Sequence, residues 1–238
     1  MVLLHYNPPH KPYLNFLYRD EHLLVLAKPS GLLSVKGRAV EHFDSLQTRV
    51  QRVYPTATIV HRLDMATSGI MLMALSKSVN RDLSRQFQQR EVSKTYIARV
   101  FGFPDNEFGR IELPLSCDWP NRPKQKVDQD NGKPSITDYK VLRKDSYSSL
   151  VELSPITGRS HQLRVHMQAL GHPILGDRLY AHEQALNVSE RLLLHAQSIA
   201  FTHPISHKSI GFDLPHHFEQ EPDVNRSFEH QAFIKVTP

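Results

Sequence analysis

The stretch HRLDMATSGIMLMAL, residues 61–75, decides how the rest of the chain is interpreted. Its second part, residues 70–75, is an apolar run of strand length without proline or charge, and this pattern predicts a buried strand. The first part is charged and contains Thr, Ser and Gly, which indicates the loop leading into that strand. A loop attached to a rigid core strand supports a reactive group well. Asp64 is the candidate, with the fixed cation of Arg62 two residues away.

Length and composition predict one globular domain. The chain has 238 residues, of which 39% are hydrophobic and 22% charged. The net charge of +5 is compatible with a nucleic-acid partner but also with many other partners. The single cysteine, Cys117, excludes an intrachain disulfide and fits a reducing compartment. Because no segment approaches the roughly 20 apolar residues that span a bilayer, we expect a cytoplasmic protein without membrane contact.

The 15 histidines raise the hypothesis of a metal site. His161 and His166 lie five residues apart on one predicted helix, which is not the spacing of the paired histidines in zinc hydrolases. His203 and His207 flank Pro204 in a predicted turn. We therefore expect no metal, and a metal-dependent hydrolase is the weaker alternative.

The N-terminal part is predicted to contain a hairpin and a helix. Residues 13–27 alternate apolar and polar side chains around a turn at 19–22, which predicts two antiparallel strands. The segment KPSG at 28–31 ends the second strand, because Pro and Gly break a ladder. Apolar residues at helical spacing predict a helix over 42–54.

After the 61–75 stretch we predict a helix and a strand. Ser78 is the expected cap of the helix, whose apolar stripe includes Val79 and Leu83. Residues 92–100 are rich in β-branched side chains, and a period of two places Lys94 and Tyr96 on one face of this strand.

Residues 113–134 are predicted to be a loop, because prolines and an Asn-Gly pair interrupt them. This segment combines one aromatic side chain with three cations, as binding to an RNA backbone and stacking on its bases would require. These four residues are Trp119, Arg122, Lys124 and Lys126.

Two further strands, at 136–142 and 149–154, and a helix are predicted next. The segment PITGRSHQLRVHM, residues 155–167, runs from a glycine turn into that helix, with Ser160 as the cap and Gly171 as the end. Its buried stripe is expected to be Leu163, Met167 and Leu170. Beyond about residue 215 the sequence is polar and aperiodic, so we predict a domain at 1–217 and a polar tail at 218–238.

Taken together, these motifs resemble those of the RluA family of RNA pseudouridine synthases. The resemblance rests on KPSG at 28–31, HRLD-x-x-TSG at 61–69, Lys-x-Tyr at 94–96, GRSHQLRVH at 158–166 and LLLHA at 192–196. It covers nearly the whole chain before the tail, for which the family offers no counterpart. NPP at 7–9 and CDWPNRPKQKV at 117–127 are similar to the dual-specificity member of the family.

The resemblance implies an α+β fold with a large, bent, mostly antiparallel mixed sheet. Helices and loops would flank this sheet, and the active-site cleft would cross its middle. Many family members carry an RNA-binding S4 domain before the catalytic domain. The first strand predicted here begins almost at once, so we expect no S4 domain.

The resemblance also implies the roles of individual residues. Asp64 would be the catalytic residue, Arg164 would pair with its carboxylate, and Tyr96 would lie against the target base. Arg62 would fill the space that a flipped base leaves. The further residues expected to contact RNA are His61, Thr67, Lys94, Trp119, Arg122, Lys124, Lys126, Arg159, His161 and Leu193.

The implied reaction is the isomerisation of uridine to pseudouridine within RNA. The implied partners are a tRNA anticodon stem-loop and a hairpin loop of 23S ribosomal RNA, and the enzyme is expected to act as a monomer. Since substrate and product are isomers, no cofactor is needed. Two alternatives stay open: a relative that modifies another uridine, and a non-catalytic RNA-binding protein with the same fold.

Overall fold

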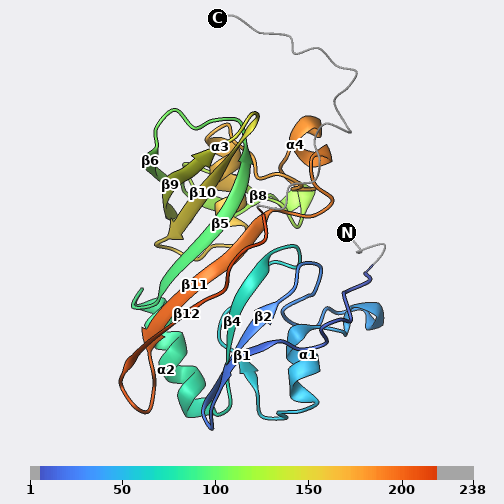
Figure 1. Ribbon diagram of the computed structural model, residues 1–238, viewed down its shortest axis with the longest axis vertical. Coiled ribbons are helices and arrows are strands. Elements are labelled where there is room, and N and C mark those ends of the chain that lie inside the picture. Colours follow the sequence, from blue (N-terminus) through green and yellow to red (C-terminus); the bar gives the residue numbers. More distant parts are fainter. Residues whose placement is uncertain (1–5, 219–238) are drawn as a thin grey trace, which may run out of the picture.

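The computed structural model describes residues 6–218, and within them ten strands form one mixed sheet (Figure 1). The strand order is β1-β2-β4-β11-β5-β10-β9-β6, with β12 paired to β11 and β3 paired to β4. Of the strand pairs in this part of the chain only β4–β11 is parallel. The implied α+β fold with a mostly antiparallel sheet is therefore confirmed. The division at residue 217 stays a prediction, because only Phe218 of the proposed tail is described.

The strands of the large sheet are β1 (Phe16–Arg19), β2 (Leu23–Lys28), β3 (Thr58–Ile59), β4 (Ser68–Ala74), β5 (Ser93–Phe101), β6 (Phe108–Glu112), β9 (Ile136–Lys144), β10 (Ser148–Pro155), β11 (Leu194–Thr202) and β12 (Ser209–Asp213). A separate hairpin consists of β7 (Leu115–Cys117) and β8 (Gln125–Val127). The helices are α1 (Leu46–Gln51), α2 (Lys77–Gln88), α3 (Gln162–Ala169) and α4 (Glu183–Asn187), with short 3₁₀ turns at Val40–His42 and Trp119–Asn121.

Strand β11 joins the two halves of the sheet. It runs between β4 and β5, so a strand from late in the chain lies between two earlier ones (Figure 1). Every residue of β4 is buried, as its apolar sequence predicts. One apolar cluster packs α2 against β2 and β4, and a second packs α1 against the same two strands. Asp64 lies in the loop that leads into β4. Because α1 and α2 both pack against β2 and β4, this loop has a rigid support.

Two predicted helix starts are wrong, and serine side chains explain both. The helix predicted over 42–54 begins only at Leu46, because Ser45 accepts a hydrogen bond from the Thr48 amide and forms a capping box. The second helix begins after Ser76 rather than after Ser78, since the Ser76 hydroxyl accepts from the Val79 amide.

Three further predictions are corrected between residues 113 and 171. The segment 113–134 is not all loop, because the three-residue strands β7 and β8 are too short to show an alternating pattern. Ser160 does not cap α3. His161 holds the cap position, with φ of +55° and no hydrogen bond from its side chain to the first turn. Leu170 is 36% exposed rather than buried, whereas Gly171 ends the helix in the left-handed conformation, as predicted.

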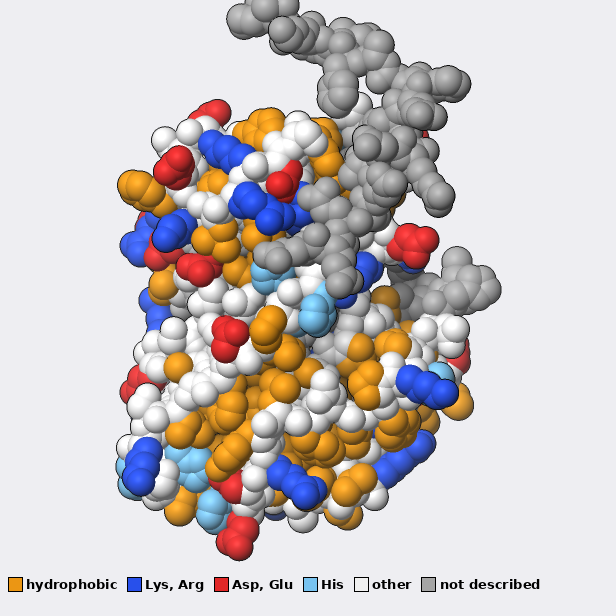
Figure 2. Space-filling view, in the orientation of Figure 1, with side chains coloured by type: hydrophobic (Ala, Val, Ile, Leu, Met, Phe, Trp, Pro, Cys, Tyr) orange, Lys and Arg blue, Asp and Glu red, His pale blue; other side chains and the backbone are white. Residues whose placement is uncertain are grey.

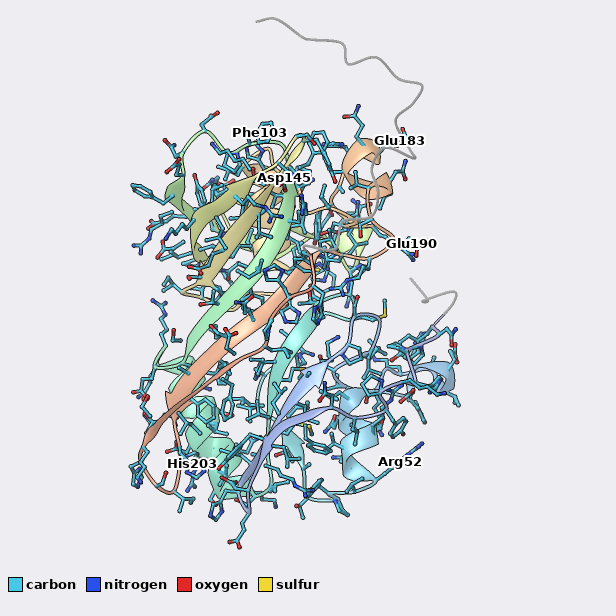
Figure 3. All side chains as sticks on the ribbon, viewed as in Figure 1. Arg52, Phe103, Asp145, Glu183, Glu190 and His203 are labelled. Carbon is cyan, nitrogen blue, oxygen red and sulfur yellow. The ribbon has the colours of Figure 1, made fainter. Side chains whose placement is uncertain are left out.

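Polar contacts between side chains tie segments together near both ends of the sheet. Near one end, the buried Arg99 of β5 contacts Asp145 between β9 and β10 (Figure 3). At the other end, His203 after β11 lies 2.9 Å from Asp20 in the turn between β1 and β2 (Figure 3). Hydrophobic side chains gather over the lower half of the face seen in Figure 2, whereas Lys and Arg side chains are scattered over the upper half and the rim.

We predict that Gly69→Ala destabilises the sheet strongly. Gly69 has φ of +122°, and an added Cβ would lie 2.3 Å from the backbone oxygen of Ala196 on β11. Because backbone atoms on both sides must move, the free energy of unfolding should fall by about 3 kcal/mol. Urea denaturation of the two proteins measures this change.

Gly211→Ala on β12 is the matched control, because its added Cβ would make only ordinary contacts with β11, the nearest at 3.6 Å. Its stability should stay within about 0.5 kcal/mol of the wild type. Equal stability of the Gly69 and Gly211 variants would show that β4 and β11 do not approach as closely as described.

Candidate active site

Asp64 lies in a tight turn that is tied to the end of β2. The Thr67 amide donates to the backbone oxygen of Asp64 at 3.1 Å, which closes the turn. The buried Lys28 ammonium and the Gly31 amide both donate to the Met65 oxygen, at 3.1 and 2.8 Å. These bonds fix the backbone at Asp64 and at the next residue, Met65, so the Asp64 side chain starts from a defined position.

The centre of the sheet brings three strands together beside this turn. Across β4, β11 and β5, Gly69 is in register with Ala196, and Ala196 is in register with Tyr96. Because Gly69 has no side chain, Ala196 can approach β4 closely. Tyr96 therefore lies near the start of β4, next to the Asp64 turn, and both residues line one cavity.

The Arg164 guanidinium joins Asp64 to a second carboxylate. Arg164 Nη1 donates to Asp64 Oδ2 at 3.0 Å, while Nε and Nη2 donate to the two oxygens of Asp177 at 2.8 and 2.7 Å. Arg164 is 5% exposed, and the side chain of Asp177 is fully buried. Burial alone would lower the pKa of Arg164, but the hydrogen bonds and charges of Asp177 and Asp64 outweigh it and raise this pKa. The guanidinium is thus a permanent cation beside Asp64.

His161 is the second side chain, after Arg164, that faces the Asp64 carboxylate. Its Nε2 lies 3.8 Å from Asp64 Oδ2, and its Nδ1 lies 2.6 Å from the hydroxyl of Tyr180. Burial lowers the pKa of His161, the Arg164 charge acts in the same direction, and Asp64 opposes them. The imidazole is therefore mainly neutral at pH 7.

These groups line a cavity of about 120 Å³. The cavity contains most of the residues that the sequence singles out near Asp64. They are Arg62, Asp64, Thr67, Lys94, Tyr96, Arg159, His161 and Arg164. The implied catalytic set of Asp64, Tyr96 and Arg164 therefore shares one cavity, although roughly 100 residues separate its ends, as the sequence numbers show.

Two expected RNA contacts point elsewhere. His61 stacks on Phe87, and its Nε2 accepts the Leu72 amide at 3.0 Å. Burial lowers the pKa of His61 to about 3, with the charge of Lys94 adding to this effect, so His61 is neutral and partly buried. Leu193 lines a different cavity of about 430 Å³, and Leu194 lines the Asp64 cavity instead. Adjacent residues of an extended chain face opposite sides, which explains this exchange.

The basic aromatic segment forms the β7–β8 hairpin rather than a wall of the cavity. Trp119 is 69% exposed near its tip, and the Arg122 guanidinium lies 4.8 Å from the centre of the Trp119 ring. Lys124 and Lys126 flank Gln125 in the sequence. The backbone N–H of Gln125 donates a hydrogen bond to the Tyr180 hydroxyl at 2.8 Å. The hairpin is thus anchored beside the site through Tyr180.

The structure adds Asp177 and Tyr180 to the site. Asp177 lies 13 residues after Arg164 in the chain, and its position beside Arg164 is a contact in space that no sequence spacing reveals. Tyr180 carries no sequence signal of its own, because a tyrosine after a turn is usually a core residue.

The described residues contain neither a metal-binding cluster nor a membrane-spanning helix. No group of three or more His, Cys, Asp or Glu side chains within residues 6–218 is arranged to hold a metal ion. In the same part of the chain, no helix is both long and apolar enough to cross a bilayer.

Known proteins with the same sequence pattern agree on one family. The family model described as RNA pseudouridylate synthase matches residues 22–169. The dual-specificity RNA pseudouridine synthase RluA of Salmonella typhimurium is 56% identical over 92% of this chain and 100% of that protein. The protein of the same name from Vibrio parahaemolyticus is 51% identical over 94% of this chain and 91% of its own length.

Solved structures agree with the fold. Human RNA pseudouridylate synthase domain containing 1 superposes with a TM-score of 0.73 at 29% identity, covering 89% of this chain and 87% of that one. Human RNA pseudouridylate synthase domain containing 4 gives a TM-score of 0.68 at 26% identity, with 84% and 88% covered. A cavity with a fixed carboxylate, this fold and these relatives lead to one conclusion: the chain belongs to the RNA pseudouridine synthases of the RluA type.

Proposed function

We propose that this pseudouridine synthase acts on uridines in two RNAs, a tRNA anticodon stem-loop and a hairpin loop of 23S ribosomal RNA, with Asp64 as its catalytic carboxylate. The observation that carries the role of Asp64 is its position in the cavity, 3.0 Å from a buried arginine. The dual target is supported by relatives whose names state dual specificity. Both RNAs occur in the cytoplasm, where we expect the enzyme to work as a monomer.

The isomerisation breaks the bond from uracil nitrogen to the ribose, turns the base and joins a ring carbon to the same ribose carbon. The ionised carboxylate of Asp64 could attack the sugar as a nucleophile, or it could take a ribose proton to give a glycal. Both routes need Asp64 charged and aimed at the sugar. Arg164 fixes the direction of this carboxylate through one hydrogen bond.

Tyr96 is proposed to hold the face of the target base. Burial raises the pKa of Tyr96 above its usual value, and the charge of Asp64 adds to the rise. The hydroxyl is therefore a phenol at pH 7 and a weak acceptor of the ring proton that leaves at the end. A stacking role fits this state better than a role as a strong base.

Arg62 is proposed to fill the space left by the extruded nucleotide. Arg62 is exposed at the cavity and lies two residues before Asp64, so its side chain can enter the RNA as the base enters the cavity. Extrusion of a base costs a few kcal/mol, and a side chain that replaces the lost stacking lowers that cost. The exposed Trp119 and the cations beside it are proposed to hold the rest of the loop.

We predict that Asp64→Asn abolishes turnover. The amide keeps the shape and a hydrogen bond to Arg164 but has neither the nucleophile nor the base, so the rate should fall at least about a thousandfold. The assay follows tritium release from anticodon stem-loop and 23S hairpin transcripts labelled on the uracil carbon that becomes the glycosidic atom.

Circular dichroism and RNA binding of Asp64→Asn should match the wild type, which serves as the control for folding. Wild-type release from only one RNA would reject the dual target and keep the chemistry. Rapid release by the variant would remove Asp64 from the proposed role.

We predict that Arg164→Lys also disables the enzyme. An ammonium is a point donor and cannot bond both Asp177 oxygens while it donates to Asp64. The tritium-release rate should fall at least about a hundredfold, because the direction of the carboxylate is lost. A variant with full activity would show that charge alone, without the fork, is sufficient.

We predict that Arg62→Ala slows the enzyme selectively on structured RNA. The rate on the anticodon stem-loop should fall about tenfold or more, while an unpaired oligonucleotide with the same target uridine should lose less than about threefold. Arg81→Ala is the matched control, because Arg81 is an exposed cation on α2 away from the cavity. Equal losses on the two RNAs would contradict a role in base flipping.

A further inference from the structure

The hydroxyl of Tyr180 lies between the β7–β8 hairpin and the candidate active site. It accepts a hydrogen bond from the Gln125 amide at 2.8 Å, and it lies 2.6 Å from Nδ1 of His161. Tyr180 is 6% exposed, and its ring lies under the Arg164 guanidinium, 5.0 Å from the ring centre. Beyond its anchoring of the hairpin, Tyr180 has no part in the proposed reaction.

The direction of the hydrogen bonds follows from the Gln125 amide. The donor is the backbone N–H of Gln125, which can only donate, so the hydroxyl accepts there and its own hydrogen is available for His161 Nδ1. When Nδ1 accepts, the ring hydrogen of neutral His161 lies on Nε2, the atom that faces Asp64 at 3.8 Å. Burial raises the pKa of Tyr180 to about 12, so the hydroxyl keeps its hydrogen at neutral pH.

The backbone conformation of His161 fits a ring that is held in a fixed place. Its φ of +55° lies in the left-handed region, which a residue with a Cβ adopts at a cost of about 1 kcal/mol. Its side chain does not cap α3, although it occupies the cap position. The strained backbone instead places the ring between Tyr180 and Asp64.

We propose that Tyr180 is a positioning residue that acts through His161: it holds the ring with Nε2–H toward Asp64, so that the carboxylate gains a neutral donor besides Arg164. This inference rests on the proposed role of Asp64. At 3.8 Å the contact is longer than a hydrogen bond, and a small rotation of the carboxylate closes it when the nucleotide enters. Because Gln125 lies between Lys124 and Lys126, the same bonds join the RNA-binding hairpin to the carboxylate.

The test is a double-mutant cycle on the single-turnover rate of tritium release from the anticodon stem-loop. Tyr180→Phe removes only the hydroxyl. His161→Asn keeps an acceptor where Nδ1 stands, tolerates the left-handed backbone and removes Nε2. At saturating RNA, each single variant should be about tenfold slower, the loss expected for one hydrogen bond to a charged group.

The double variant decides whether Tyr180 acts through His161. It should be no slower than either single variant, because the second change removes a contact that no longer matters. Tyr139→Phe removes the hydroxyl of a buried tyrosine outside the cavity; it is the control and should keep the wild-type rate. A wild-type rate for Tyr180→Phe, or the same tenfold loss in the His161→Asn background, would overturn the proposal.

Nitrogen-15 spectra of the histidine rings give a readout that does not depend on turnover, with His161 assigned by its loss in His161→Asn. In the wild type, the neutral ring of His161 should carry its hydrogen on Nε2 only. In Tyr180→Phe, both tautomers of this ring should be present. A hydrogen on Nδ1 in the wild type would refute the proposal even if the enzyme is active. Absence of wild-type tritium release from both RNAs would instead reject the proposed substrates, so the two failures are distinguishable.

Discussion

The buried guanidinium of Arg164 sets the geometry of the site. A cation that is 5% exposed must be matched by carboxylates, because water cannot reach it. The fully buried Asp177 satisfies two of its nitrogens and leaves Nη1 for Asp64. The direction of that remaining N–H then decides where the Asp64 turn can lie. The turn is held in place because Lys28 and Gly31 both donate to the backbone oxygen of Met65, the residue after Asp64.

The sheet makes this meeting possible for residues far apart in the chain. Strand β11 enters late and pairs with β4 and β5, which places Ala196 between Gly69 and Tyr96. The parallel β4–β11 pair brings the start of both strands to one place, and the Asp64 turn and Leu194 meet there. A glycine at position 69 is required because the backbone of Ala196 occupies the space of a Cβ.

The sequence predicts the parts of this arrangement that depend on local pattern or on a family motif. An apolar run identifies β4, and β-branched residues identify β5. The motifs single out Asp64, Tyr96 and Arg164, and these three residues line one cavity in the structure. The sequence does not distinguish Leu193 from Leu194, because a shift of one residue exchanges the two faces of a strand. Tyr180 is also missed, since its importance comes from the Gln125 amide and the His161 ring, and neither contact has a sequence spacing.

Sharing Arg164 between two carboxylates also explains how Asp64 can be held and still react. A carboxylate paired alone with a bidentate arginine would have both oxygens occupied and its charge largely compensated. Here Asp177 takes the bidentate position, and Asp64 receives one N–H on Oδ2. The two carboxylates together exceed the guanidinium by one negative charge, so Asp64 keeps electron density for the sugar. A neutral His161 beside it adds direction without a second positive charge, and that is the reason its protonation state matters to the chemistry.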